Sequence, residues 1–288
     1  MVSVVIPTLN AGQEIERLLD SLFNQTCPPD EIVVIDSSST DNTQTLAKSY
    51  PKVNLITIPK SKFDHGGTRN LGFRNTHGEF VIYMTQDALP ANERMIGALL
   101  QPFANEKVAL VTARQLPRGN ARRFEQLVRS YRYPPHSNIR SEANIKTDGI
   151  NAFFASDVCS AYRRDALNSI GGFPEPCKTN EDMLAAERLL RAGYLVAYEA
   201  ASCVFHSHNF TLSEEYRRNY LIGVFLNEYS EELSIESEIG EGTSLAKNVV
   251  GTLLSEHNYS EAAAFILDCG ARFLGNRMGR LSCQDKEH

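Results

Sequence analysis

The chain has 288 residues, of which 42% are hydrophobic and 22% are charged, and its formal net charge is −6 at pH 7. These values are those of a globular protein that can bury a sizeable core, as one large domain or as a domain with a helical appendage. The negative charge argues against a general nucleic-acid binder, because such a protein needs a strongly basic face.

Strand and helix patterns alternate along the first 112 residues. Short apolar runs predict strands, and apolar residues at helical spacing predict the helices between them. Strands are expected at 2–6, 31–35, 53–58, 80–84 and 108–112, and helices at about 15–22, 42–49, 68–75 and 92–103. This alternation indicates right-handed βαβ units, and therefore an α/β fold in which helices cover both faces of a mostly parallel sheet.

The pattern becomes less regular after residue 112. A stretch rich in Arg, Pro and Asn predicts an excursion from the sheet, and a helix further on is stopped by Gly193. The excursion is expected at 114–150 with some helix at 121–131, followed by regular structure at 153–162, a helix at 180–192, a strand at 194–198 and helices beyond about 211.

The chain shows no sign of export or of membrane insertion. The first predicted strand begins directly after Met1, which leaves no room for a signal peptide, and no run of 18 apolar residues occurs. The six cysteines are scattered, without a close pair at metal-binding spacing. We therefore expect reduced thiols in a cytoplasmic protein that is soluble or peripherally attached to a membrane.

Four polar loops follow the first four predicted strands, at 7–10, 36–41, 60–70 and 85–90. In open parallel sheets, ligands bind outside the carboxyl ends of the strands, so these loops are expected to meet at one edge. Loops of this kind are usually polar, but here they also carry Asp, Arg and His side chains. We predict a ligand site at this edge.

Asp87 is the candidate metal ligand. It follows the apolar strand 80–84, where a carboxylate can hold a cation against the phosphates of a ligand. The alternative is ordinary turn chemistry before Pro90. His206 or His208 could add an imidazole, which suits manganese better than magnesium, although a histidine at a strand edge is often structural.

Two further loops offer groups for a nucleotide. Asp36 can accept a hydrogen bond from the imide N–H of a pyrimidine base, or it can cap the next helix, a role that Asp41 fills better. The run 63–70 supplies two glycines and Arg69 ahead of a helix, which is a reasonable cradle for phosphate oxygens.

Glu181 and Asp182 follow Thr179 and Asn180 at the start of a predicted helix. In one interpretation Asn180 caps the helix and the two acids favour its dipole. In the other, Asp182 is a general base that takes a proton from an acceptor hydroxyl. A helix start lowers the pKa of a carboxylate, whereas burial or the neighbouring Glu181 raises it, so both interpretations stay open.

Nine segments together resemble one enzyme family. They are VSVVIPTLNAG, IVVIDSSSTDNT, FDHGGTRNLG, YMTQDALP, ARQLPRGNA, FFASDVCSAYRRDAL, IGGFPE, NEDMLAAERLLRAGY and VFHSHNFTL, and they cover roughly residues 2 to 225 in the expected order. The chain resembles an inverting nucleotide-sugar glycosyltransferase of family 2 with the GT-A fold, most closely a bacterial rhamnosyltransferase. The segments FDHGGTRN, TQDA and ARQLP carry the resemblance to rhamnosyl transfer.

The resemblance implies roles for individual residues. Asp182 is implied as the catalytic base, and Asp87 as a metal ligand together with His206, or with His208 as the alternative. Glu181 and Arg163 are implied on the acceptor side. The implied donor-binding residues are Thr8, Asn10, Asp36, Ser38, Arg69, Gln86 and Asp87. Two positions depart from the family pattern, since Thr85 replaces the first acid of the metal motif and Ser38 replaces a common glycine.

The resemblance also implies a domain plan, with a GT-A domain at 1–225 and a C-terminal helical extension at 226–288. Within that domain, 1–113 is the nucleotide-sugar-binding half and 114–225 the acceptor and catalytic half. The tail carries Arg272, Arg277 and Arg280, which can meet anionic lipid or form a solvated helix face.

The implied activity is transfer of L-rhamnose from dTDP-β-L-rhamnose, assisted by Mn²⁺ or Mg²⁺, to a glycan or lipid-linked oligosaccharide in the synthesis of a bacterial surface polysaccharide. Two alternatives remain: transfer from another nucleotide-sugar, such as a UDP-hexose or a UDP-N-acetylhexosamine, and a nucleotide-sugar-binding protein with weak or no activity. The replacement of an acid by Thr85 is the feature that favours the last.

Overall fold

The computed structural model describes residues 1–233 and 239–282, and within them the chain forms two compact units. The first unit contains residues 1–115, 134–177 and 181–206. The second unit contains residues 116–133, 178–180 and the part of the chain from 207 onward. The domain limits predicted from the sequence, 1–225 and 226–288, stay a prediction.

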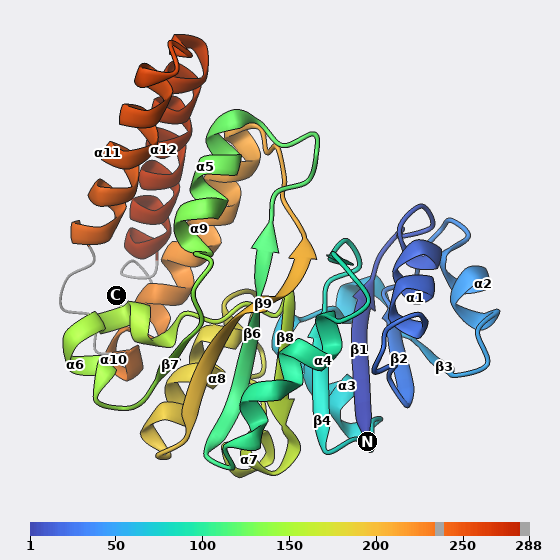
Figure 1. Ribbon diagram of the computed structural model, residues 1–288. Helices are drawn as coiled ribbons and strands as arrows, with labels where there is room; N and C mark the ends of the chain where they lie inside the picture. The colour runs from blue at the N-terminus through green and yellow to red at the C-terminus, as the bar shows by residue number, and fades with distance from the viewer. Residues whose placement is uncertain (234–238, 283–288) are drawn as a thin grey trace. The chain divides into compact units, whose positions relative to one another are not determined.

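The first unit is built around a mixed sheet (Figure 1). Within the described residues the sheet has nine strands in the order β3-β2-β1-β4-β8-β6-β9-β5, with β7 also paired to β9. The strands are β1 Val2–Thr8, β2 Glu31–Asp36, β3 Val53–Thr57, β4 Phe80–Met84, β5 Leu89–Pro90, β6 Val108–Leu116, β7 Asn138–Arg140, β8 Cys159–Arg163 and β9 Leu195–Phe205.

Helices account for most of the remaining regular structure. The first unit contains α1 Ile15–Phe23, α2 Thr43–Lys48, α3 His65–Arg74, α4 Met95–Leu100, α6 Asn144–Asp148, α7 Arg164–Ser169 and α8 Glu181–Arg191, with short 3₁₀ turns at Lys60–Lys62, Gln101–Ala104 and Gly149–Phe153. The second unit contains α5 Arg123–Arg132, α9 Leu212–Glu228, α10 Ser230–Leu233, α11 Ile239–Ser255 and α12 Tyr259–Leu281.

The parallel part of the sheet agrees with the sequence prediction. Strands β3, β2, β1 and β4 are neighbours and all run parallel, and the α/β class is confirmed. The strand predicted at 108–112 is observed as β6, but it does not pair with β4. Strand β8 lies between them and runs antiparallel to both, because the chain returns to the sheet in the opposite direction after the excursion.

Alternating side chains on the central strands bury both faces of the sheet. On one face Val4, Ile6 and Ile82 pack with α1, α2 and α4 in a single hydrophobic cluster. On the other face α3 lies directly on the strands, since a Cβ at Gly72 would stand 2.4 Å from a methyl of Val5. Because helices cover both faces of the sheet, the polar loops gather at the edge formed by the carboxyl ends of the strands.

In the second unit, glycines bring two long helices together. A Cβ added at Gly223, Gly275 or Gly279 would lie 2.0–2.3 Å from a backbone carbonyl oxygen of the facing helix, so α9 and α12 pack at close range (Figure 1). The charged side chains of α12 partly face this contact, where Arg272 pairs with Asp268 at 2.6 Å and with Glu215 at 2.9 Å.

Two sequence expectations concern the whole chain. Within the described part, no helix combines the length and the hydropathy required to cross a bilayer. Five of the six cysteines are free thiols, and the sixth, Cys283, lies outside the described residues.

Candidate active site

A pocket of about 310 Å³ opens at the carboxyl ends of the parallel strands. It lies within the first unit, at the edge where the sequence predicts a ligand site. It is lined by Pro7, Thr8, Leu9, Ser37, Lys60, Phe63, His65, Arg69, Thr85 and Gln86. Four predicted donor-binding loops therefore meet here, and Thr8, Arg69 and Gln86 are the predicted residues that line the pocket itself.

Gln86 joins the loops that follow β1 and β4. Its side-chain oxygen accepts a hydrogen bond from the Leu9 backbone N–H at 2.8 Å, and its side-chain nitrogen donates to the Leu9 carbonyl at 3.2 Å. Because one amide satisfies both polar groups of Leu9, the two loops are held in a fixed register. Gln86 thus has a structural role in addition to lining the pocket.

Asn10 and Ser38 have left-handed backbones next to the pocket, with φ values of 51° and 59°. The side-chain oxygen of Asn10 accepts a hydrogen bond from the Thr40 backbone N–H at 2.9 Å, and the hydroxyl of Ser38 donates to the Ile58 carbonyl at 2.8 Å. A positive φ favours glycine, which gives a physical reason for the glycine that the family resemblance implies at the position of Ser38. Both side chains support loops and are not among the lining residues.

Asp36 is fully buried, and the protein itself surrounds its carboxylate with donors. One oxygen accepts from the hydroxyls of Thr8 and Ser39, and the other accepts from the Ser39 backbone N–H at 2.8 Å and the Gln44 amide at 2.7 Å. An ionised carboxylate has about four acceptor positions, and all four are used. A base imide N–H could bind Asp36 only by displacing one of these donors.

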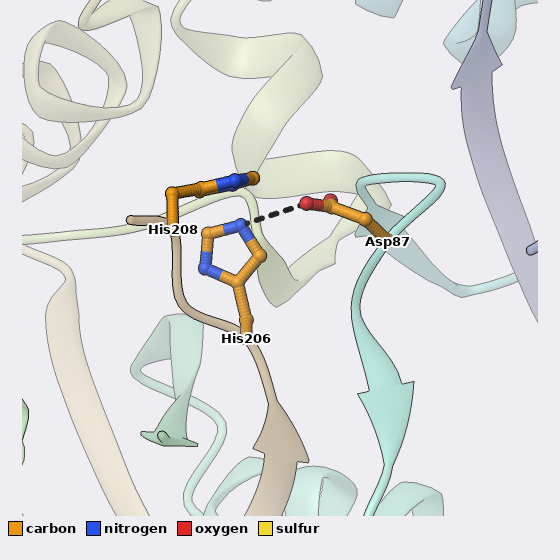
Figure 2. A group of neighbouring side chains, drawn as sticks. All are labelled: Asp87, His206 and His208. Atoms are coloured by element: carbon orange, nitrogen blue, oxygen red, sulfur yellow. Dashed lines mark ion pairs between the residues drawn. The ribbon is translucent and has the colours of Figure 1, made fainter. Parts of the chain in front are cut away.

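Asp87 and His206 are brought together as the sequence predicts (Figure 2). Nε2 of His206 lies 3.4 Å from a carboxylate oxygen of Asp87, and Nδ1 lies 3.0 Å from the side-chain oxygen of Gln115. Gln115 in turn donates to the Ser156 hydroxyl at 2.8 Å. An amide oxygen can only accept, so Nδ1 carries a proton, and when the ring is neutral Nε2 presents its lone pair to Asp87.

This arrangement suits a divalent cation. A lone pair and a carboxylate oxygen that face each other at 3.4 Å repel unless a proton or a cation lies between them. Ligand atoms about 2.1 Å from one ion are roughly 3 to 3.5 Å apart, and the Gln115 contact orients His206 as supporting residues do in metal sites. His208, the predicted alternative, belongs to the second unit, and its part in the metal site stays a prediction.

Asp182 lies at the start of α8 and keeps some solvent exposure. Its carboxylate accepts hydrogen bonds from the backbone N–H of Asp157 at 3.0 Å and of Met183 at 2.8 Å. Burial, and the nearby acids Glu181 and Asp157, raise the pKa of Asp182 to about 8. A carboxylate with a pKa near neutrality can both accept and release a proton at physiological pH, as a general base must.

Arg69 is not a free cation in the pocket. Its Nε lies 2.8 Å from a carboxylate oxygen of Asp157 and its Nη1 lies 2.7 Å from one of Glu181, and the side chain is almost completely buried. The second oxygen of Asp157 accepts hydrogen bonds from the hydroxyls of Ser160 and Tyr162. Two acids therefore match the charge of Arg69, and its predicted place near a diphosphate stays a prediction.

Glu181 belongs to this buried group. Burial raises the pKa of Glu181, while the guanidinium of Arg69 opposes that shift. Burial also lowers the pKa of His65 to about 4, so this imidazole, 3.8 Å from Glu181, is neutral at physiological pH. Glu181 therefore depends on Arg69 for its counter-charge, and its predicted acceptor-side role stays a prediction.

A short chain of backbone contacts relates Asp182 to the pocket. Asp182 accepts from the N–H of Asp157, and the carbonyl of the next residue, Val158, accepts from the N–H of Thr85 at 3.2 Å. Thr85 lines the pocket and lies two residues before Asp87. The segment 157–158 therefore connects the loop of the predicted metal ligand to the predicted base.

The predicted place of Arg163 on the acceptor side is wrong. Arg163 is the last residue of β8 and pairs with Phe80, the first residue of β4, so it lies at the opposite edge of the sheet from the pocket. Its guanidinium donates to the Phe103 carbonyl at 2.9 Å and lies over the rings of Phe80 and Phe103. Because β8 runs antiparallel to β4, its end faces away from the ligand edge, and Arg163 does not belong to the acceptor side.

Sequence reasoning missed several residues of the site. Asp157 pairs with Arg69, and Ser37, Lys60, Phe63 and His65 line the pocket. All of them except Lys60 fall within a segment that resembles the family, but the segments alone do not indicate the individual contacts. A lone Asp before a strand gives no signal of a partner that lies 88 positions earlier in the chain.

The mixed sheet with helices around it is a GT-A fold. Residues 3–171 match the family described as Glycosyl transferase family 2. The chain belongs to glycosyl transferase family 2, which confirms the family and fold predicted from the sequence.

Two curated relatives match over almost the whole chain. The O-antigen chain rhamnosyltransferase RfbN of Salmonella typhimurium is 36% identical over 97% of this chain and 89% of its own length. The O-antigen chain rhamnosyltransferase WbaN of Salmonella anatum is 36% identical over 96% of this chain and 89% of its own length.

Solved structures share the fold at lower sequence identity. The mannosyltransferase PcManGT from Pyrobaculum calidifontis, in complex with GDP-Man and Mn²⁺, is 18% identical, with a TM-score of 0.60 over 96% of this chain and 83% of its own. S. aureus TarS 1–349 in complex with UDP-GlcNAc is 19% identical, with a TM-score of 0.55 over 98% of this chain and 92% of its own.

We predict that Arg69→Met lowers the free energy of unfolding by about 3–5 kcal/mol, because it leaves two buried carboxylates without their counter-charge. The double variant Arg69→Met, Glu181→Gln should lose less free energy of unfolding than the sum of the two single losses, by about 1 kcal/mol or more. The reason is that Glu181→Gln removes one of the two buried carboxylates that Arg69→Met leaves unpaired. Urea unfolding of the four proteins of this cycle measures both quantities. Arg74→Met, at the exposed end of the same helix, is the control. Simple additivity of the two changes would contradict the pairing.

Proposed function

We propose that this chain is an inverting glycosyltransferase that moves L-rhamnose from dTDP-β-L-rhamnose to a hydroxyl group of a glycan or lipid-linked oligosaccharide. Family membership supports the reaction class. The sugar is supported by two relatives at 36% identity whose names are O-antigen chain rhamnosyltransferases. Their shared role supports a place in the synthesis of a bacterial surface polysaccharide.

The observation that carries the proposal is the position of Asp182. Its carboxylate is held by two backbone N–H groups and is connected, through Asp157 and Val158, to Thr85 at the rim of the pocket. A base held in this way is oriented before substrate binds, and orientation is a large part of what a displacement between two bound substrates needs. Asp182 is thus the group best placed to receive the acceptor proton.

The proposed reaction is a single displacement. The acceptor oxygen forms a bond to the anomeric carbon while the bond from that carbon to the phosphate oxygen breaks, and dTDP departs with the bonding electrons. Asp182 takes the proton of the acceptor hydroxyl, and the configuration at the anomeric carbon changes from β to α. No side chain of the protein needs to act as a nucleophile, so positioning and charge stabilisation supply the catalysis.

Asp87 and His206 are the residues that would hold a divalent cation, and their fit to one is described above. When bound, the cation neutralises charge on a departing diphosphate. An imidazole ligand favours Mn²⁺ over Mg²⁺. Thr85 offers a hydroxyl at the position where the family resemblance implies an acid, which leaves one carboxylate in this motif instead of two.

Two alternatives from the sequence remain in view. A transferase for a different sugar would use all of these residues in the same roles. Only the identity of the nucleotide-sugar donor therefore distinguishes it from a rhamnosyltransferase. A nucleotide-sugar-binding protein without activity is favoured by Thr85 alone and is opposed by the oriented, high-pKa carboxylate of Asp182.

A panel of nucleotide-sugars tests the proposal. With Mn²⁺ present and acceptor absent, slow release of dTDP from dTDP-β-L-rhamnose is expected, because water can take the place of the acceptor. Release of nucleotide should be at least tenfold slower from UDP-glucose, UDP-N-acetylglucosamine and GDP-mannose. Faster release from one of these would reassign the sugar, and release from none of the donors would favour the binding protein.

The pH dependence of kcat/KM tests Asp182 as the base. Activity needs the ionised carboxylate, so kcat/KM should fall as the pH drops below the pKa of about 8. Glu181→Gln removes a like charge that raises this pKa, and the acidic limb of the profile should therefore move to lower pH. Glu79→Gln, at an exposed position, is the control. If the acidic limb of the Glu181→Gln profile stays in place or moves to higher pH, a group other than Asp182 controls the activity.

We also propose peripheral contact with a membrane through α12, which would bring the enzyme to a lipid-linked acceptor. Six large side chains of this helix that are counted as hydrophobic are 48–64% exposed: Tyr259, Ile266, Leu267, Phe273, Leu274 and Met278. Of the three tail arginines, Arg277 is exposed, whereas Arg272 pairs with Asp268 and Glu215 and Arg280 donates to Asn276.

Co-sedimentation with phosphatidylethanolamine–phosphatidylglycerol vesicles measures this contact. The full chain should bind, and a Phe273→Glu, Leu274→Glu double variant should stay in the supernatant, because two acids oppose both burial and the anionic surface. Gly270→Ala is the control, since an added Cβ there meets nothing within 4 Å. Equal binding of the double variant would place the contact elsewhere.

A further inference from the structure

The pocket has two chemically different ends. Thr85 and Gln86, which follow β4, line the end nearest in sequence to Asp87. Ser37, which follows β2, and Phe63, which lies shortly after β3, line the other end. Since β1 separates β2 from β4 and neighbouring strands lie about 4.8 Å apart, the two ends are roughly 10 Å apart, about the length of a nucleoside.

This geometry sets the direction in which a nucleoside diphosphate enters. The diphosphate belongs at the β4 end, next to the carboxylate and imidazole of Asp87 and His206. The base then reaches the end formed by the loops after β2 and β3. Asp36, the last residue of β2, lies at that end of the pocket. Its four acceptor positions are already occupied by donors from Thr8, Ser39 and Gln44, so none is left for a base.

We propose that Phe63 is the surface on which the base of the donor nucleotide stacks and that the Ser37 hydroxyl is its hydrogen-bond partner, with Asp36 only positioning the loop. The proposal deepens the proposed function, on which its choice of a nucleotide ligand rests. It assigns recognition of the base to two side chains that the family resemblance does not name.

Phe63 has the exposure that stacking requires. Its side chain is 38% exposed although it is a large apolar group, and it lines the pocket. The edge of one ring meets the face of the other between Phe63 and His65, with centroids 5.0 Å apart and planes 72° apart. This contact supports the ring of Phe63, and an aromatic face next to a ligand pocket is what a nucleobase binds by stacking.

Ser37 lacks the hydrogen bond that a buried hydroxyl normally makes. The residue is 2% exposed, and its hydroxyl has no partner among the described residues. Leaving a buried hydroxyl unpaired is unfavourable, and no existing bond restrains its rotation about χ1. A base that enters the pocket offers the missing partner, because a hydroxyl can donate to a base carbonyl or accept from an imide N–H.

Titration with dTDP and with pyrophosphate, without any sugar, tests the proposal. Phe63→Ala should weaken dTDP binding at least tenfold and leave pyrophosphate binding unchanged, because pyrophosphate has no base to stack. Phe63→Tyr should bind dTDP as the unaltered protein does. Ser37→Ala should weaken dTDP binding several-fold without lowering the melting temperature, since the lost hydroxyl has no partner in the free protein.

Matched substitutions control for general effects. Ile139→Ala removes an exposed apolar side chain from β7, outside the pocket, and should leave dTDP affinity unchanged. Ser202→Ala removes a buried hydroxyl that donates to the Met95 carbonyl, and it should lower the melting temperature but not the affinity. Undiminished dTDP binding by Phe63→Ala, or an equal loss of pyrophosphate binding, would overturn the proposal.

A wrong donor assignment can be distinguished from a wrong stacking proposal. If the unaltered protein binds UDP or GDP but not dTDP, the rhamnosyl donor is wrong, and the same variants are then titrated with the nucleotide that binds. An intact affinity of Phe63→Ala for that nucleotide would overturn the stacking proposal on its own.

Discussion

The site depends on the burial of one guanidinium between two carboxylates. Arg69 on α3 contacts Asp157 and Glu181, and neither of these acids has another cation at comparable distance among the described ion pairs. Moving such groups from water is costly, and the mutual contacts offset the cost only while the geometry is kept. The segment before β8 and the start of α8 are therefore fixed relative to α3, and Asp182 is fixed with them.

The same contacts explain the chemistry of Asp182. A carboxylate at a helix start would ordinarily have a lowered pKa, because the helix dipole stabilises its charge. Here burial and two neighbouring acids act in the opposite direction and dominate. The cation of Arg69 is directed at Glu181 and Asp157, which leaves Asp182 basic. The arrangement thus gives two adjacent acids different surroundings: Glu181 is paired with Arg69, whereas Asp182, the proposed base, has a raised pKa.

The sequence predicted the parallel strands and the loops that gather at their carboxyl ends, because apolar runs and turn residues are local signals. It also predicted that His206 or His208 would join Asp87, and the resemblance to a family favoured His206. It did not predict that Asp36 and Arg69 would be engaged by the protein itself, since Gln44, Asp157 and Glu181 contact them through side-chain geometry that no spacing rule encodes.

Arg163 shows why a motif alone is not enough. It lies in a segment that matches the family, yet β8 runs antiparallel to β4 and ends at the edge away from the pocket. The direction of that strand follows from the long excursion before it, which local patterns do not describe. Ser38 is the opposite case. Its positive φ gives a physical reason for the glycine that the family resemblance implies at this position, and that reason appears only once the fold is known.

The central claim is that Asp182 receives the acceptor proton. The most direct measurement compares turnover and dTDP affinity in Asp182→Asn, with the exposed Asp20→Asn on α1 as the control. An amide keeps the shape of the side chain but cannot take a proton, so turnover of dTDP-β-L-rhamnose should fall at least a thousandfold, within the range that general base catalysis supplies (about 10²–10⁴), while dTDP binds as before. Retained turnover, or loss of dTDP binding together with turnover, would contradict the account.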